Sequence, residues 1–274
     1  MRILLIISAF LFFVTGKPTP VQVKKTDVSG QLEKLFVRLR QNFNPEKKLE
    51  INDSIRSIID SYAASDTVFD HRFGDLRYLG QITSPDSLIK IITWNLILSD
   101  GEDRYFLFFI KRSDKKARGQ VVTLNGIYND APIRSDTIYS SDNWYGALYY
   151  DTRPFIFNGR TYYILLGIDY GNSFITRKII DVLSFDQDQK PIFGLNCFFD
   201  GKSMKSRIVF EYSANAVMSL KFEADNMIVF DHLSPVSTEY KDNHQFYGPD
   251  FSFDAYNYEK GLWRYKGDID IRNK

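Results

Sequence analysis

The chain has 274 residues and carries 35 Lys and Arg residues against 34 Asp and Glu residues, a formal net charge of +1 at pH 7. A net charge this small excludes broad electrostatic capture of nucleic acid or of an anionic membrane. The hydrophobic content of 44% excludes a largely disordered chain. The length suits one large domain, or one domain with a small addition.

Residues 1–16 have the pattern of a secretory signal peptide. The positive charge of Arg2 precedes an apolar run over residues 3–14, in which Ser8 is the one polar residue, and the small residue Gly16 follows. This run is shorter than the roughly 20 residues that a membrane-spanning helix needs, and no later segment is apolar enough to replace it. We therefore expect export through a cleaved signal, to the periplasm or the medium, with no transmembrane segment. Residues 17–28 are expected to form a flexible leader.

Residues 29–65 are predicted to form a pair of short helices. The first helix, with Ser29 as its predicted cap, has apolar residues at helical spacing: Leu32, Leu35, Phe36, Leu39 and Phe43. Asn44-Pro45 interrupts this pattern, and Asn52 or Asp53 is predicted to cap the second helix. The apolar face of the second helix contains Ile55, Ile58, Ile59 and Tyr62. Because helices of this length are not stable alone, we expect both to pack on a sheet.

Residues 66–274 are predicted to form an antiparallel β domain, because the hydrophobic periodicity changes to two near Phe69. Asn158-Gly159 predicts a tight hairpin turn, since both residues tolerate positive φ. Residues 162–168 are apolar on both faces, which predicts a central strand. The predicted strands span residues 88–96, 105–111, 120–124, 145–150, 154–157, 162–168, 178–185, 207–212, 216–222, 227–230 and 263–271.

These elements predict a mainly β (α+β) fold, with an antiparallel β-sheet body and an N-terminal pair of short helices. Three architectures stay open at this point: a sandwich, a barrel and a small propeller-like body. The sequence has no clean repeat of about 40–50 residues that would favour the propeller.

Five stretches of the sequence resemble segments of a family of uncharacterised secreted proteins of Bacteroidetes-type bacteria. They are residues 86–94, 143–150, 177–185, 230–235 and 247–254. The resemblance covers most of residues 29–270. It implies an exported bacterial protein, and because the family has no named activity it carries over no catalytic residue.

Asp250, Asp254 and His232 are the candidate catalytic residues. Paired carboxylates can serve glycoside hydrolysis or bind calcium, and a carboxylate beside an imidazole can orient a general base. His232 directly follows Asp231, but neighbours on a strand point to opposite faces, so these two side chains are not expected to pair. The alternative is that the Asp side chains only stabilise their own turns.

No metal-binding, cofactor-binding or nucleophile motif is present in the sequence, so we expect no metal site and no cofactor. Cys197 is the only cysteine, which excludes an intramolecular disulfide. Its apolar neighbours predict a buried, unreactive thiol, because reactive thiols need an electropositive and accessible setting.

Aromatic residues make up 16% of the chain, and many fall in apparent loops. Exposed aromatic rings among polar residues are suitable platforms for sugars or peptides. The alternative is that the loops fold back and use these rings as local cores. The candidate binding residues are Trp144, Tyr145, Phe246, Tyr247, Phe251 and Phe253.

Taken together, these features favour an exported, non-enzymatic binding or structural module. Its expected partner is a glycan or an envelope protein, and no nucleic acid is expected. The alternative is a hydrolase of envelope or dietary polymers that uses the paired carboxylates.

Overall fold

The computed structural model describes residues 28–74, 76–98, 103–127 and 132–270. The predicted signal peptide, and all of the predicted leader except residue 28, lie outside the described residues. The helices are α1 (Val28–Gln41), α2 (Pro45–Ala63) and the short 3₁₀ helices η1 (Ser141–Asn143), η2 (Thr238–Tyr240) and η3 (His244–Phe246). The strands are β1 (Gly80–Thr83), β2 (Ile89–Leu96), β3 (Arg104–Lys111), β4 (Gln120–Ile127), β5 (Tyr139–Ser140), β6 (Leu148–Phe157), β7 (Arg160–Asp169), β8 (Ile175–Phe185), β9 (Pro191–Phe193), β10 (Phe198–Phe199), β11 (Met204–Lys205), β12 (Ile208–Ser213), β13 (Leu220–Ala224), β14 (Met227–Pro235), β15 (Tyr247–Glu259) and β16 (Leu262–Lys266).

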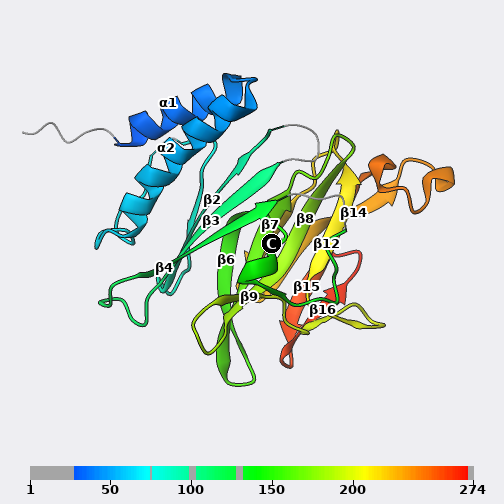
Figure 1. The fold of residues 1–274 in the computed structure, drawn as a ribbon. Coiled ribbons are helices and arrows are strands. Elements are labelled where there is room, and N and C mark those ends of the chain that lie inside the picture. The colour runs from blue at the N-terminus through cyan, green and yellow to red at the C-terminus, as the bar shows by residue number, and fades with distance from the viewer. Residues whose placement is uncertain (1–27, 75, 99–102, 128–131, 271–274) are drawn as a thin grey trace, which may run out of the picture.

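The elements form four layers, a helical pair followed by three sheets (Figure 1). Sheet A has the strand order β1-β2-β3-β4, and sheet B has the order β5-β9-β8-β7-β6, with β12 also paired to β8. Sheet C has the order β11-β10-β16-β15-β14-β13. The helices and the three sheets follow one another in the layer order in which they occur along the chain, apart from β12.

The helical layer packs on one face of sheet A. Leu32 and Phe36 of α1 and Ile55 of α2 are buried against Trp94 and Phe108. Because α1 and α2 bury one stripe each, the spacing of their apolar residues accounts for this contact.

Three details of the predicted helices are wrong. Helix α1 already includes Val28, so Ser29 lies inside the helix instead of capping it. Helix α2 begins at Pro45 with Asn44 as its N-cap, where the Asn44 side chain accepts a hydrogen bond from the backbone N–H of Lys47. Asn52 lies within the helix instead of capping it, and accepts a hydrogen bond from Trp94 Nε1 at 2.8 Å. Phe43 lies after α1 and is 92% exposed. The start of α2 at Pro45 has a local reason, since proline at the first helical position starts a helix as readily as it ends one.

Sheets A and B are each buried on both faces. In β2 all eight residues are buried, and alternate side chains point to the helices or to sheet B. In β7, Leu165 points toward sheet A while Ile164 and Leu166 point toward sheet C. The predicted central strand over residues 162–168 therefore lies between β6 and β8, as its apolar composition on both faces requires.

The predicted hairpin turn is present between β6 and β7. Asn158 has a φ of 49° and Gly159 a φ of 73°, which places both residues in the left-handed region that this tight turn requires. The predicted strands at residues 145–150 and 154–157 merge into one strand, β6, because β7 pairs along its whole length.

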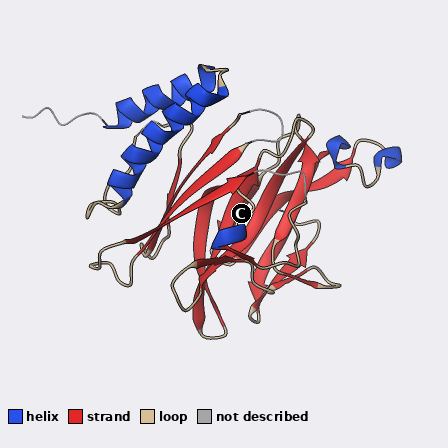
Figure 2. Cartoon of the chain, in the orientation of Figure 1, coloured by secondary structure: helices blue, strands red, loops and turns tan. Residues whose placement is uncertain are grey.

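The fold class is confirmed: the protein is mainly β, with antiparallel sheets and two helices near the N-terminus (Figure 2). In the described residues no sheet closes on itself, so the barrel alternative is wrong. One strand pair is parallel, β10 with β16. The 13-residue strand β15 was not expected, because residues 247–259 lack a clean two-residue alternation.

A buried ion pair lies in the core between sheets A and B. The side chains of Asp181 on β8 and Arg207 just before β12 are both 0% exposed. The Nε atom of Arg207 lies 3.2 Å from Oδ2 of Asp181. The other guanidinium nitrogens donate to the carbonyl oxygens of Arg134, Thr137 and Phe193. One side chain therefore links the segment before β5 to β9 and β8.

We predict that Arg207→Met destabilises the protein by about 3–5 kcal/mol, because Asp181 would keep a buried charge without its cation. Urea unfolding followed by circular dichroism measures the loss. The matched control is Arg134→Met, which breaks an exposed ion pair with Asp136 and should leave the free energy of unfolding nearly unchanged. Equal effects of the two substitutions would contradict the assigned role of Arg207.

Candidate functional site

The three candidate catalytic residues meet in sheet C. His232 Nδ1 lies 2.8 Å from Asp254 Oδ2, and His232 Nε2 lies 3.9 Å from Asp250 Oδ2. His232 is on β14, and both carboxylates are on β15. We name these three residues the His232 cluster. As expected, Asp231 does not pair with His232; its side chain accepts a hydrogen bond from the backbone N–H of Ser219 instead.

A bulge between β14 and β15 brings the cluster together. Asp231 pairs with Phe253 and Leu233 pairs with Pro249, so three residues of β15 face the single residue His232. Such a bulge bends the strand and re-aims its side chains. The middle residue of the three, Phe251, has a φ of 70°. The carboxylate of Asp250 closes the bulge by accepting hydrogen bonds from the N–H and the hydroxyl of Ser252.

Asp254 positions the imidazole. It is 4% exposed and accepts hydrogen bonds from His232, from the Tyr265 hydroxyl at 2.8 Å and from the backbone N–H of Asp268 at 3.0 Å. These three hydrogen bonds hold the carboxylate of Asp254 in place. Because the carboxylate of Asp254 can only accept a hydrogen bond, Nδ1 of His232 carries the proton that is shared with it. The other ring nitrogen, Nε2, is directed toward Asp250.

The electrostatics of the cluster favour the charged forms. The hydrogen bond to Asp254, together with the nearby charge of Asp250, raises the pKa of His232 above its usual value. For Asp250, partial burial raises the pKa, but the hydrogen bonds from Ser252 and the proximity of His232 outweigh it, so the net pKa is lowered. The cluster therefore combines two carboxylates with one imidazole that binds its proton more tightly than a free histidine.

Of the six candidate binding aromatics, Phe251 is the one that is almost fully exposed, at 95%. Phe253 is half-buried within the same strand. Phe246 stacks on Tyr240 with ring centroids 4.0 Å apart, and Tyr247 packs against the core between sheets B and C. The two rings Phe246 and Tyr247 thus contribute to local packing, which is the alternative considered for loop aromatics.

Trp144 and Tyr145 do not form an exposed platform, and this expectation is wrong. Trp144 is 4% exposed, stacks on Phe193 and donates a hydrogen bond to the Tyr149 hydroxyl. The hydroxyl of Tyr145 donates to Asp181 at 2.6 Å. Both rings complete the core between sheets A and B, because the 132–147 segment folds over that core instead of projecting into solvent.

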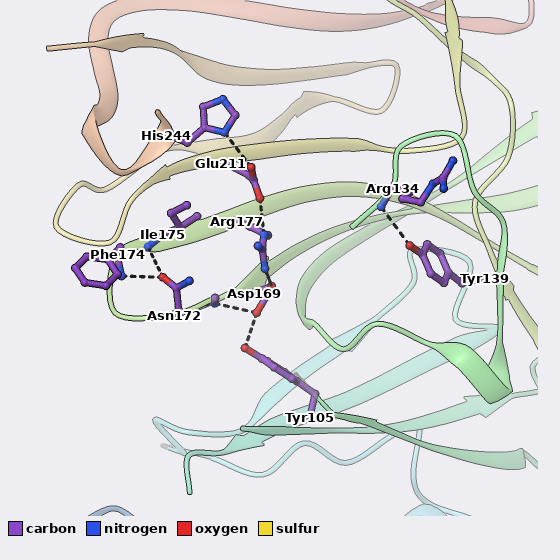
Figure 3. Close-up of polar contacts among 11 residues, drawn as sticks. Tyr105, Arg134, Tyr139, Asp169, Asn172, Phe174, Ile175, Arg177, Glu211 and His244 are labelled. Atoms are coloured by element: carbon purple, nitrogen blue, oxygen red, sulfur yellow. Dashed lines mark hydrogen bonds and ion pairs between the residues drawn. The ribbon is translucent and has the colours of Figure 1, made fainter. Parts of the chain in front are cut away.

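A second polar network was not predicted from the sequence. Tyr105 donates to Asp169 at 2.8 Å, Arg177 contacts Asp169 at 3.0 Å and Glu211 at 2.7 Å, and Glu211 contacts His244 Nδ1 at 2.9 Å (Figure 3). Burial, reinforced by Asp169, raises the pKa of Tyr105 well above its usual value. The one sequence signal for this network is that Asp169 and Arg177 place charged side chains near the ends of the largely apolar strands β7 and β8.

The network ends at a small cavity. Glu211 and His244 line a space of about 200 Å³ together with Pro132, Ile133, Ser135, Lys205, Ile208 and Val209.

Cys197 is 0% exposed, and burial raises the pKa of its thiol, as expected for an unreactive cysteine. In the part of the chain that the structure describes, no group of three or more His, Cys, Asp or Glu residues is arranged to hold a metal ion, and no helix is long and apolar enough to span a membrane.

We predict that Asp254→Asn lowers the pKa of His232, because the substitution removes the negative charge next to Nδ1. The raised pKa also sets the sign of the pH dependence of stability. Protonated His232 stabilises the fold fully below its unfolded pKa of about 6.5, and this contribution is lost as the pH rises through the folded pKa. Titration of the imidazole C–H signals by NMR measures the three histidines of the chain, and His244 is the internal control. An unchanged His232 pKa in the variant would contradict the geometry.

No family model, curated protein or solved structure matches the chain. The resemblance to secreted proteins of Bacteroidetes-type bacteria therefore stays a prediction. The functional interpretation rests on the fold, which is mainly β with antiparallel sheets, and on the geometry of the His232 cluster.

Proposed function

We propose that the protein is exported through its N-terminal signal and acts as a non-enzymatic binding module for glycans. The proposed contact surface lies on sheet C around the His232 cluster. The observation that carries the proposal is Phe251, which is 95% exposed and directly follows Asp250 in the bulge.

Phe251 combines two unfavourable features. A large apolar side chain is left in water, and its φ of 70° lies in the left-handed region, which costs a non-glycine residue about 1–3 kcal/mol. Backbone strain of this kind concentrates at functional sites. An exposed ring gives a sugar an apolar face to stack on, while Asp250 and His232 offer hydrogen-bonding groups next to it.

Other exposed apolar side chains flank the same region. Val217 is 86% exposed and lies two residues before Ser219. The backbone N–H of Ser219 donates to the Asp231 side chain, and the backbone N–H of Asp231 donates to the carbonyl oxygen of Ser219. Val236 is 76% exposed and follows the end of β14. Both valines therefore lie in segments next to β14, the strand that contains His232.

One observation favours a second function, hydrolysis of a glycan. Asp250 and Asp254 both contact one imidazole ring, so their carboxyl groups are separated by no more than the about 9.5 Å found in glycosidases. The Nδ1 contact with Asp254 also resembles the way a carboxylate orients a general base. Binding is preferred because Asp254 is buried and occupied by three hydrogen bonds, which leaves it to position His232 instead of acting on a substrate.

The export part of the proposal predicts processing of the chain. Expressed with its own N-terminus in a bacterial host, the mature protein should begin near Lys17, as measured by N-terminal sequencing and mass spectrometry. Phe10→Arg places a charge in the apolar run and should block processing. A full-length wild-type chain that retains Met1 and stays in the cytoplasm would overturn this part.

The binding part predicts that Phe251→Ala weakens glycan binding at least about tenfold, or about 1.4 kcal/mol, through loss of the stacking face. A glycan array identifies the ligand, and calorimetry compares the variants.

The matched control is Phe43→Ala, which removes a ring of nearly equal exposure, 92%, from the opposite end of the layered stack. Equal losses in the two variants, or no glycan bound by the wild type, would overturn the assignment. Turnover of a bound glycan that His232→Ala abolishes would favour hydrolysis instead.

A further inference from the structure

A basic hollow lies far along the chain from the His232 cluster, at the loop between β3 and β4. It has a volume of about 460 Å³. Its lining residues are Asp66, Asp70, Ser87, Arg112, Lys115, Lys116, Ala117 and Arg118. Because the whole chain has a net charge of only +1, four cationic side chains around one hollow are a local feature and not a reflection of general basicity.

Arg112 is fixed in place at the edge of this hollow. Its Nε donates to the carbonyl oxygen of Ser87 at 2.8 Å, and its Nη1 donates to the carbonyl oxygen of Lys115 at 2.8 Å. The guanidinium carbon lies 3.9 Å from the centroid of the Phe69 ring. These contacts leave the planar guanidinium pre-organised, so little side-chain entropy is lost when another acceptor binds to it.

Lys115 and Lys116 are presented by a turn. The side chain of Asp114 accepts hydrogen bonds from the backbone N–H groups of Lys116 at 2.8 Å and Ala117 at 3.0 Å, which holds the loop in shape. Both lysines are exposed. Within the described residues, neither ammonium group has an ion pair or a hydrogen bond, so both are available to a ligand.

The acidic residues of the hollow do not cancel this charge. Asp66 is paired with Arg118 at 3.4 Å, and Arg118 also donates to the carbonyl oxygen of Ala64. Asp70 acts electrostatically on the buried ammonium group of Lys90. Arg112, Lys115 and Lys116 therefore remain as three cations, with the carboxylates of Asp70 and of the turn residue Asp114 nearby.

We propose that this hollow binds a ligand that carries phosphate groups. Arginine supplies two parallel donors that fit a phosphate, and the lysines supply additional positive charge without a fixed geometry. The same chemistry is found in soluble phosphate esters and in the headgroups of anionic phospholipids. The site is independent of the proposed glycan surface on sheet C, so either proposal can fail without the other.

The test uses the full mature chain with inorganic pyrophosphate as the soluble probe, measured by calorimetry at low salt. Vesicles of phosphatidylglycerol, compared with vesicles of phosphatidylcholine, distinguish a lipid source from a soluble one. The variant Lys115→Ala with Lys116→Ala should fold normally, because both residues are exposed and neither ammonium group has a hydrogen bond or an ion pair within the described residues. Its affinity for the preferred probe should fall about tenfold or more, whereas added salt should weaken wild-type binding.

Two controls keep the proposal falsifiable. Lys202→Ala with Lys241→Ala removes the same charge from exposed positions outside the hollow and should change the affinity less than about twofold. Arg112→Lys keeps the charge but loses the planar pair of donors, and it should weaken binding more than the control does. Absence of binding to both probes by the wild type, or equal losses in the double variant and its lysine control, would overturn the site.

Discussion

Sheet B lies between two other sheets, and this double-sided burial is the constraint on which most of the structure depends. A strand in such a sheet has no solvent-facing side, so every polar side chain on it must find a partner inside the protein. Asp181 meets this requirement through Arg207 and Tyr145. The same pairing fixes the segment before β5, because Arg207 also bonds to carbonyl groups there. Burial of one carboxylate thus fixes residues 134–137 against the core.

The same constraint accounts for the network from Tyr105 to His244. Asp169 and Arg177 lie on neighbouring strands of sheet B and are nearly fully buried, so each needs a partner of opposite charge. Arg177 then extends to Glu211 on β12, and Glu211 to His244 in η3. Polar contacts therefore connect sheet A, through sheet B, to the segment between β14 and β15. In contrast, the His232 cluster lies at a bulge in sheet C, where His232 and Asp250 stay partly exposed and Asp254 is buried.

The sequence predicts the parts of the fold that depend on local chemistry. Asn158-Gly159 specifies its turn by backbone conformation alone, and residues 162–168 show their central position by being apolar on both faces. Strand β15 could not be predicted in this way, because the bulge at Phe251 breaks the alternation that defines a strand. The start of α2 was misplaced because a proline can either end or begin a helix.

The candidate site was predictable in its residue types and not in its arrangement. The chemistry of Asp250, Asp254 and His232 makes them candidates, but their meeting depends on the register of β14 against β15, which no local pattern encodes. Trp144 was misassigned for the complementary reason. An aromatic ring in a loop has the same sequence signature whether the loop covers a core or faces solvent, so burial there is decided by tertiary packing.

The parallel pairing of β10 with β16 has a consequence for how the molecule assembles. The first layers use pairings between elements that are close in the sequence, so each can form soon after its own strands are available. Sheet C is different, because β16 must insert between β15 and β10, which is about sixty residues earlier in the chain. Until that strand arrives, β10 and β11 have no place in the sheet and the buried ring of Trp263 is absent from the last core. The third core is therefore complete only when β16 lies between β10 and β15.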